Sequence, residues 1–256
     1  MNLSNKLVVI LGPTAVGKTK FGSQLAYRFN GEIISADSRQ VYIGMDIGTG
    51  KDLEDYEVNN KRINTHLIDI IKPHCEFNLY LFTQLFQTSF EEIHKENYLP
   101  FLVGGTGLYL SAILHSYRLQ TVDFNSERTL ELKNLEVEEL KNILLAKNRN
   151  LHNTTDLIDK ERIINAILIA ENKNEFDKKN FKISPLVIGL QEGREILKAR
   201  IQKRLKARLQ SGMIEEVVSS MHDLRNKNGL IVFPLNRCQD KDRLMDRQGA
   251  QKPTGP

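Results

Sequence analysis

The sequence predicts an α/β fold in which a parallel sheet is flanked by helices and carries a helical insertion. Two observations support this prediction. Short apolar runs rich in β-branched residues alternate with stretches of helical periodicity, which is the order of strands and helices in a parallel sheet. Between residues 119 and 182 the chain is instead rich in Asn, Lys and Glu and shows no strand pattern. We therefore expect a core of residues 1–118 and 183–224 and a helical insertion of residues 119–182.

The first strand and the first helix enclose a glycine-rich loop. Residues 7–11 form an apolar run typical of a buried strand, and residues 18–29 predict a helix with Phe21, Leu25 and Phe29 on its buried face. The loop between them fits the phosphate-binding pattern G-x-x-x-x-G-K-[ST] without a mismatch. Its residues are Gly12, Pro13, Thr14, Ala15, Val16, Gly17, Lys18 and Thr19. The order of strand, loop and helix predicts a P-loop NTPase-like sheet.

This loop predicts a site for a phosphorylated ligand. Gly12 and Gly17 let the backbone turn so that its N–H groups approach phosphate oxygens, and the helix N-terminus adds partial positive charge. Lys18 would bring a full positive charge to the terminal phosphate oxygens, and the Thr19 hydroxyl would bind a magnesium ion. We therefore expect Mg²⁺ as a cofactor, with Thr19 as its ligand.

A polar segment follows the second expected strand, residues 32–35. It contains Asp37, Ser38, Arg39 and Gln40, which stand just beyond the carboxyl end of the strand. Ligands of open α/β sheets bind at that edge, so these four side chains are candidate binding residues. A glycine-rich loop comes next, at 44–51, and residues 66–70 predict a third strand or an extended segment.

The next strand departs from the usual NTPase pattern. A helix is expected at 79–97, with an inward face made of Leu81, Leu85, Phe86, Phe90 and Ile93. The strand and glycine turn that follow, at 100–107, end in Gly104-Gly105-Thr106, where such enzymes normally carry an Asp that holds the metal. Asp69 is the candidate replacement, but the pattern better indicates that the loop serves something other than routine ATP hydrolysis.

Helices dominate the rest of the chain. One is expected at 108–115, and the insertion shows helical periodicity at 127–147 and 159–171. After a strand at 185–190, residues 193–210 predict a helix whose apolar stripe packs on the sheet. That stripe contains Leu197, Ile201, Leu205 and Leu209. Arg200, Arg204 and Arg208 share another face, and we expect at least one of them to reach the phosphate ligand. A last helix, 213–224, precedes residues 225–256, where we expect disorder.

The composition is that of an ordinary globular protein. Lys and Arg total 36 against 32 Asp and Glu, so the net charge of +4 is only weak support for a nucleic-acid partner. The N-terminus lacks a signal-peptide pattern, and no apolar stretch is long enough to span a membrane. We expect a cytoplasmic monomer that has no membrane partner.

Four segments together resemble the tRNA dimethylallyltransferases, also called tRNA isopentenyltransferases. They are residues 12–19, 34–42, 44–49 and 103–109, and a weaker resemblance continues through 186–190 and 194–217. The resemblance implies transfer of a dimethylallyl group from dimethylallyl diphosphate to N6 of the adenosine 3′-adjacent to the anticodon of a tRNA, with release of diphosphate. It also accounts for the missing metal-binding Asp, because the loop of that family holds the diphosphate of the isoprenoid donor.

The resemblance assigns roles to individual residues. Lys18 and Arg204 match residues that contact the diphosphate, Asp37 matches the base that accepts the N6 proton, and Thr106 matches a threonine that places the adenine or the donor. We therefore predict these four as catalytic residues. The resemblance also predicts that the anticodon stem-loop of the tRNA is bound. The residues predicted to contact the tRNA are Asp37, Ser38, Arg39, Gln40 and Arg162. Local structural roles are the alternative for two of these residues. Asp37 could cap a turn, and Thr106 could form a hydrogen bond to the backbone of a turn.

The chain departs from the family pattern in two places. Asn165 stands where the family commonly has another arginine. Residues 225–256 match none of the Gly-Tyr-containing segment and further helices with which family members usually continue, so we expect an atypical or truncated C-terminus.

Three alternatives remain open from the sequence. The loop pattern alone is shared by small-molecule kinases and other P-loop NTPases. The atypical C-terminus is compatible with a catalytically impaired fragment that still binds tRNA. A related enzyme that prenylates free adenine nucleotides would carry the same loop. The sequence does not specify which tRNAs are modified.

Overall fold

The computed structural model describes residues 5–117, 127–147, 159–171 and 182–223. The predicted tail, 225–256, lies outside these residues. Contacts divide the chain into a larger unit, Met1–Ser116 with Phe181–Pro256, and a smaller unit, Tyr117–Asn180. None of the helices in the described part of the chain is long and apolar enough to cross a membrane.

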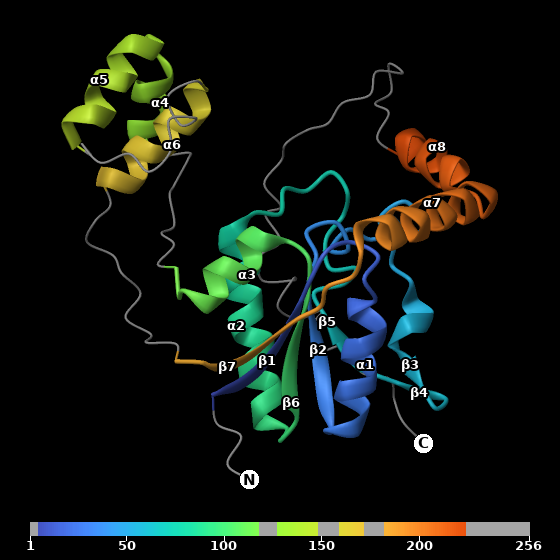
Figure 1. Cartoon of the computed structure of the whole chain (residues 1–256). Helices are drawn as coiled ribbons and strands as arrows, with labels where there is room; N and C mark the ends of the chain where they lie inside the picture. The colour runs from blue at the N-terminus through green and yellow to red at the C-terminus, as the bar shows by residue number, and fades with distance from the viewer. Residues whose placement is uncertain (1–4, 118–126, 148–158, 172–181, 224–256) are drawn as a thin grey trace. The chain divides into compact units, whose positions relative to one another are not determined.

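The larger unit is built on a parallel sheet of five strands, in the order β5-β2-β6-β1-β7. Its strands are β1 (Lys6–Leu11), β2 (Gly31–Ala36), β5 (Thr65–His66), β6 (Leu99–Gly104) and β7 (Ser184–Gly189). Figure 1 shows α1 (Lys18–Arg28) on one side of the sheet and α2 (Leu79–Lys95) with α3 (Gly107–Leu114) on the other. The predicted P-loop-like fold, with a parallel sheet between helices, is confirmed.

Side chains of the central strands alternate between two apolar clusters. On β1, Leu7 and Val9 pack with the α2 and α3 side, whereas Ile10 packs with the α1 side. On β6, Leu102 faces the first cluster and Phe101 the second. This two-residue alternation follows from the pleat of a strand, and apolar residues occupy both faces because helices cover both.

The inward faces of two helices differ in detail from the predicted ones. Phe21 and Leu25 of α1 are partly buried as expected, but Phe29 follows the end of the helix and is exposed, so that prediction is wrong. In α2, Phe82 is fully buried, whereas Leu81 is only partly buried. The remaining predicted residues of the α2 face, Leu85, Phe86, Phe90 and Ile93, are buried.

A short segment between β2 and β5 was not predicted. It comprises the 3-10 helix η1 (Leu53–Tyr56) and a two-stranded ribbon of β3 (Glu57–Val58) and β4 (Lys61–Arg62). Asn59 and Asn60 form its turn with φ angles of 52° and 59°, values that asparagine tolerates better than most residues. Tyr56, the last residue of η1, lies in the apolar cluster beside α1. The third predicted strand, 66–70, is reduced to β5 and the bridge between Tyr42 and Ile71.

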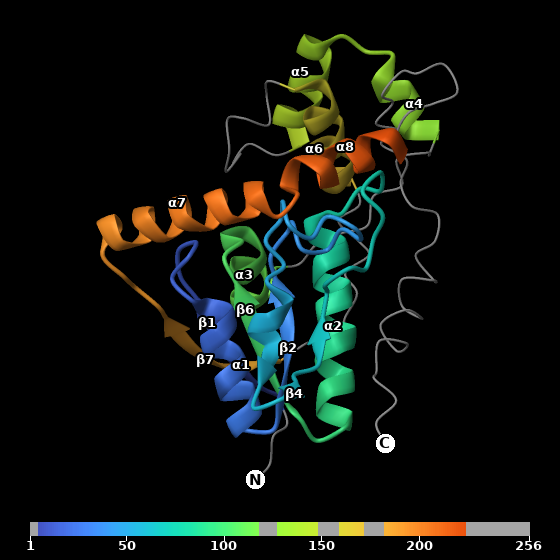
Figure 2. The same ribbon diagram turned by 90° about the vertical axis from the view of Figure 1, so that its right-hand side faces the viewer.

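Two further helices, α7 (Arg194–Gln210) and α8 (Met213–Asp223), lie beside the carboxyl ends of the strands in both Figure 1 and Figure 2. We call them the α7–α8 arm. The predicted packing of the α7 stripe on the sheet is wrong, because Ile201, Leu205 and Leu209 are 42%, 48% and 43% exposed. All residues of α7 are described, and none is buried. Its arginines, not its leucines, face the loops of the sheet.

The smaller unit contains α4 (Glu127–Lys133), α5 (Val137–Lys147) and α6 (Lys160–Glu171). Residues 134–136 interrupt the helical stretch predicted at 127–147. A small apolar core joins the three helices and contains Leu132, Leu140, Leu144, Ile163, Ile164, Ile167 and Leu168. Arg128 of α4 pairs with Glu171 at the end of α6 at 2.9 Å. The unit therefore has a core of its own.

Candidate active site

The predicted phosphate-binding loop joins β1 to α1. Gly12 and Gly17 have φ angles of 155° and 94°, and Ala15 also has a positive φ of 65°. A side chain on Gly12 would place its Cβ 2.5 Å from the Leu190 carbonyl oxygen, so the first glycine is required where the loop passes the end of β7. The Lys18 Nζ donates to the Pro13 carbonyl at 2.8 Å and thus lies over its own loop.

Lys18 is in a mixed electrostatic environment. Burial lowers the pKa of its ammonium group from the ordinary value of 10.5, the nearby Asp37 carboxylate raises it, and Arg204 lowers it further. Both predicted partners are therefore close enough to act on Lys18 through their charges. Three of the four predicted catalytic residues, from β1–α1, β2 and α7, meet at this end of the sheet.

The fourth, Thr106, lies on the loop after β6 and contacts the Asp37 loop. The Ser38 amide donates to the Thr106 Oγ1 at 3.0 Å, and the Thr106 amide donates to the Ala36 carbonyl at 3.1 Å. Thr106 is also the N-cap residue of α3, but its side chain makes no capping hydrogen bond there. The hydroxyl instead joins two loops that follow neighbouring strands.

Two glycines bring these loops close together. A Cβ on Gly104 would lie 2.2 Å from the Ala36 carbonyl oxygen, a contact that rigid backbone cannot relieve. A Cβ on Gly105 would lie 3.5 Å from the Lys18 Nζ. NTPases carry a metal-binding Asp at this strand end. In this chain, glycines there let the loop after β2 and the Lys18 side chain come close to β6.

Asp37 makes a local turn contact as well as facing Lys18. Its Oδ1 accepts a hydrogen bond from the Arg39 amide at 2.9 Å. This bond uses one of the two carboxylate oxygens, so the turn-forming and proton-accepting roles are compatible. Ser38 is half-buried and Arg39 is exposed.

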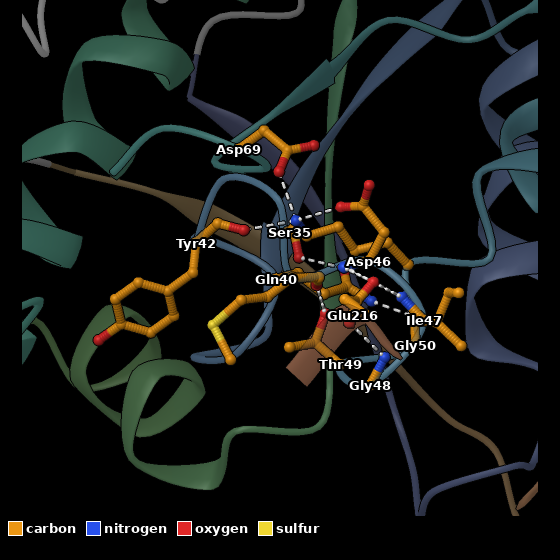
Figure 3. Close-up of polar contacts among 12 residues, drawn as sticks. Ser35, Gln40, Tyr42, Asp46, Ile47, Gly48, Thr49, Gly50, Asp69 and Glu216 are labelled. Carbon is orange, nitrogen blue, oxygen red and sulfur yellow. Dashed lines mark hydrogen bonds and ion pairs between the residues drawn. The ribbon is translucent and has the colours of Figure 1, made fainter. Parts of the chain in front are cut away.

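Gln40 is buried, with 8% of its surface exposed, and belongs to the same loop. Its Oε1 accepts from the Ser35 hydroxyl at 3.0 Å and its Nε2 donates to the Gly50 carbonyl at 3.3 Å (Figure 3). A glutamine amide has a second acceptor position and a second donor hydrogen, so these bonds fix its orientation without using its whole capacity.

The three predicted arginines of α7 have different partners. Arg200 donates to the Ala15 carbonyl of the phosphate loop at 3.5 Å and pairs with Glu192 at 3.2 Å. Arg208 binds both carboxylate oxygens of Asp52, at 3.1 and 3.2 Å. Arg204 lies 3.6 Å from Asp52 and is the member of the row whose charge acts on Lys18. Sequence periodicity predicted the shared face, but not that Asp52 would bind two of its members.

Thr19 has a buried neighbour that the sequence analysis missed. The Tyr56 hydroxyl shares a hydrogen bond with the Thr19 side chain, and burial together with nearby Asp37 raises the tyrosine pKa far above its ordinary range. Tyr56 is therefore a protonated phenol beside the predicted metal ligand. Among the described residues, no group of three or more His, Cys, Asp or Glu side chains could hold a metal ion. The Thr19 hydroxyl beside the phosphate loop is the kind of ligand that Mg²⁺ accepts, since this ion takes few ligands from a protein and the rest from phosphate oxygens and water.

A buried ion cluster behind the Asp37 loop was also missed. Lys51, whose side chain is fully buried, pairs with Asp46 at 2.9 Å and with Asp69, and donates to the Tyr42 carbonyl at 2.5 Å. Asp69 therefore binds a lysine, whereas the sequence suggested it as a metal ligand. The only feature of the sequence that could have indicated this cluster is the lysine at the end of the 44–51 loop. Its position in the sequence does not identify the residues with which it pairs.

Arg162, the last predicted contact, belongs to the smaller unit and is described apart from the other site residues. It is exposed on α6, and its amide donates to the Asp159 carboxylate at 3.0 Å, which caps the helix. Asn165 lies one turn further along the same helix and is partly buried.

Known proteins match this chain over the segments that build the candidate site. The family model described as IPP transferase matches residues 40–238, and the model described as isopentenyl transferase matches residues 5–69. The chain is 47% identical to "tRNA dimethylallyltransferase 1" of Syntrophus aciditrophicus over 84% of its own length and 72% of the relative's. It is 47% identical to "tRNA dimethylallyltransferase 2" of Bacteroides fragilis strain ATCC 25285 over 90% and 76% of the two lengths.

Solved structures agree. A full-length tRNA isopentenylpyrophosphate transferase from Bacillus halodurans superposes with a TM-score of 0.59 at 32% identity, covering 96% of this chain and 83% of the other. A eukaryotic dimethylallyltransferase acting on tRNA superposes with a TM-score of 0.69 at 26% identity, covering 88% and 57%. The matches span the phosphate loop, the Asp37 loop and the α7–α8 arm, and the chain belongs to the tRNA dimethylallyltransferase family.

Proposed function

We propose that this chain transfers a dimethylallyl group from dimethylallyl diphosphate to N6 of the adenosine 3′-adjacent to the anticodon in tRNA and releases diphosphate. The observation that carries the proposal is the meeting of Lys18, Asp37 and Arg204 beside the phosphate loop. The two cations can bind a diphosphate, and the nearby Asp37 carboxylate can accept a proton from the attacking amine.

The donor is activated through its leaving group. The bond between the allylic carbon and the diphosphate oxygen breaks, so positive charge develops on carbon and negative charge on the diphosphate. Lys18, the loop N–H groups from Gly12 to Thr19, and Arg204 are the groups of this chain that would stabilise that negative charge. Bound Mg²⁺, held through the Thr19 hydroxyl, would add charge stabilisation at the same oxygens.

The acceptor is activated by removal of a proton. As N6 forms its bond to the allylic carbon, it must lose one hydrogen, and Asp37 is the proposed base. The Arg39 amide holds one carboxylate oxygen, which orients the other. Thr106 holds the Asp37 loop through the Ser38 amide and would help place the adenine or the donor.

The adenine must leave its stack to reach this edge of the sheet. We propose that Ser38, Arg39 and Gln40 contact the nucleotides around it and that Arg162 of the smaller unit contacts the tRNA as well. Arg39 is exposed and can bind phosphate, whereas buried Gln40 can offer only its remaining donor and acceptor positions to a base. We further propose that the enzyme works as a monomer in the cytoplasm, without a membrane partner.

The test is transfer of radiolabel from dimethylallyl diphosphate to an unmodified anticodon stem-loop, with Mg²⁺ or with a chelator. We expect label on the adenosine 3′-adjacent to the anticodon, release of one diphosphate per label, and loss of transfer in the chelator. Lys18→Ala should abolish most of the transfer, whereas Lys20→Ala, which removes an exposed charge two residues away, should not.

Three outcomes would contradict the proposal, each in favour of another function. ATP turnover without dependence on the isoprenoid would indicate a P-loop kinase or NTPase. RNA retention on a filter without labelled product would indicate a binding fragment. Label on AMP but not on the stem-loop would indicate an enzyme that acts on free nucleotides.

A further inference from the structure

The Glu216 carboxylate binds three consecutive backbone amides from a distant part of the sequence. Its Oε2 accepts from the amides of Asp46 and Ile47 at 2.9 and 2.7 Å, and its Oε1 accepts from the amide of Gly48 at 2.9 Å (Figure 3). Successive N–H groups directed at one point form a concave site for an anion. Here a carboxylate of α8 occupies that site.

Hydrogen bonds from amides to a carboxylate are charge-assisted and therefore short and strong. They matter more here because α7 contributes no buried side chain and the arm exposes the apolar residues Ile214, Val217 and Val218 of α8. Glu216 is thus a main connection between the α7–α8 arm and the loops of the sheet. A second connection is the pair of Arg208 with Asp52, at the opposite end of the same segment, 46–52.

Glycine permits this close approach. A Cβ on Gly48 would lie 3.3 Å from the Glu216 Oε1, which is tighter than most Cβ contacts, and at an ordinary 3.9 Å from the Met213 side chain. A Cβ on Gly50 would lie 2.3 Å from the Arg208 guanidinium. The segment therefore approaches the arm closely at two of its glycines.

The same segment also fixes the loop that carries the proposed tRNA contacts. The Gly50 carbonyl accepts from the Gln40 amide, and Lys51 joins Asp46 to the Tyr42 carbonyl and to Asp69. Thr49 donates to the Met45 carbonyl and closes the turn. A continuous set of hydrogen bonds thus leads from Glu216 to Gln40.

We propose that Glu216 is a positioning residue that holds the 46–48 turn, and through it the Gln40 loop, in the conformation that receives tRNA. The part of this inference that concerns tRNA rests on the proposed function, whereas the contact of Glu216 with residues 46–48 is independent of it. A purely local alternative is that Glu216 is a favourable acidic residue in the first turn of α8. Glu215 occupies the same turn and is exposed, so it provides the matched control.

The first experiment measures hydrogen exchange at the amides of Asp46, Ile47 and Gly48 in the full chain. In Glu216→Gln, one acceptor oxygen becomes a donor that faces an N–H group. Exchange at these amides should accelerate by roughly 10- to 100-fold, the range for hydrogen bonds to a charged group. Glu215→Gln should leave the exchange unchanged. Equal exchange in wild type and Glu216→Gln would overturn the proposal, whether or not the chain transfers an isoprenoid.

The second experiment separates positioning from general stability. Glu216→Gln should raise the KM for the stem-loop several-fold, while its affinity for inorganic diphosphate should fall by less than that of Arg204→Ala, because Lys18 and its loop are untouched and Arg208 still pairs the arm with Asp52. Gly48→Ala, which crowds the carboxylate without removing it, should change KM in the same direction by a smaller factor. Equal KM values for Glu216→Gln and Glu215→Gln would overturn the proposal. Absence of transfer in wild type would contradict the proposed function. The hydrogen-exchange result would then decide whether Glu216 holds the 46–48 turn.

Discussion

The sheet and the α7–α8 arm hold their site residues by different means. Leu102 of β6 is fully buried between a helix and neighbouring strands. Such close packing holds the strand ends in place and thereby positions the loops that follow them. Leu205 of α7 is 48% exposed, and the arm is instead connected through Arg200, Arg208 and Glu216. Apolar packing therefore fixes Lys18 and Asp37, whereas a few charged contacts fix Arg204. The difference indicates that the two halves of the site will respond differently to mutation, pH and salt.

The largest expected effect concerns Asp37, on the side of the site that the sheet fixes. Asp37→Asn keeps the shape of the side chain and can still accept the Arg39 amide bond, but it is a poor base. General-base catalysis typically contributes about 10² to 10⁴-fold, so single-turnover transfer should slow by that factor with little change in donor or RNA affinity. If the main role of Asp37 is the turn, the melting temperature should fall instead and the rate of the folded fraction should remain within about threefold of wild type, well below that range.

A matched pair of substitutions compares the two regions directly. Leu102→Ala should destabilise the protein by about 2–5 kcal/mol, because it opens a cavity in a fully buried cluster. Leu205→Ala removes the same atoms from an exposed helix face and should change the free energy of unfolding by less than about 0.5 kcal/mol. Urea unfolding of both variants measures the difference. A loss from Leu205→Ala as large as that from Leu102→Ala would show that the α7 stripe is buried in solution.

A smaller effect is expected from pH, through Lys18. Burial and Arg204 lower the pKa of Lys18 in the free enzyme below 10.5, and a bound diphosphate favours the charged form. Affinity for inorganic diphosphate should therefore be full below that lowered pKa and fall as the pH rises through it. Inorganic diphosphate also loses its last proton in the alkaline range, and its added negative charge acts in the opposite direction, so the pH titration of Lys18→Ala supplies the baseline for the ligand. Calorimetric titration from neutral to alkaline pH measures the decline, and Lys18→Ala should remove it.

Local motifs explain why much of the site could be predicted from sequence. Gly12 to Thr19 specify a loop geometry that depends only on the adjacent strand and helix, and the segment after β2 lies at the ligand edge of any parallel sheet. Even there the partners were not predictable. Thr106 meets Ser38 across 68 residues, and this contact depends on which strands are neighbours.

The arm and the buried cluster show what periodicity leaves undetermined. The four-residue spacing of Leu197, Ile201, Leu205 and Leu209 correctly predicted a helix, but spacing says nothing about which face of a helix is covered. Lys51 and Glu216 each have partners that only the folded chain brings together, 168 to 170 residues apart in the case of Glu216. Lysine and glutamate are also common on protein surfaces, so nothing in the sequence distinguishes these two residues from their exposed counterparts.

The central claim is that the sheet and the arm bind one diphosphate together, and its most direct test is the affinity for inorganic diphosphate with Mg²⁺ in three variants. Lys18→Ala should weaken binding by roughly 10- to 100-fold, the range for charge-assisted hydrogen bonds. Arg204→Ala should weaken it by a smaller factor, and Arg208→Ala, whose guanidinium is engaged by Asp52, should change it little. Unchanged affinity in Arg204→Ala, or equal losses from Arg204→Ala and Arg208→Ala, would contradict the claim.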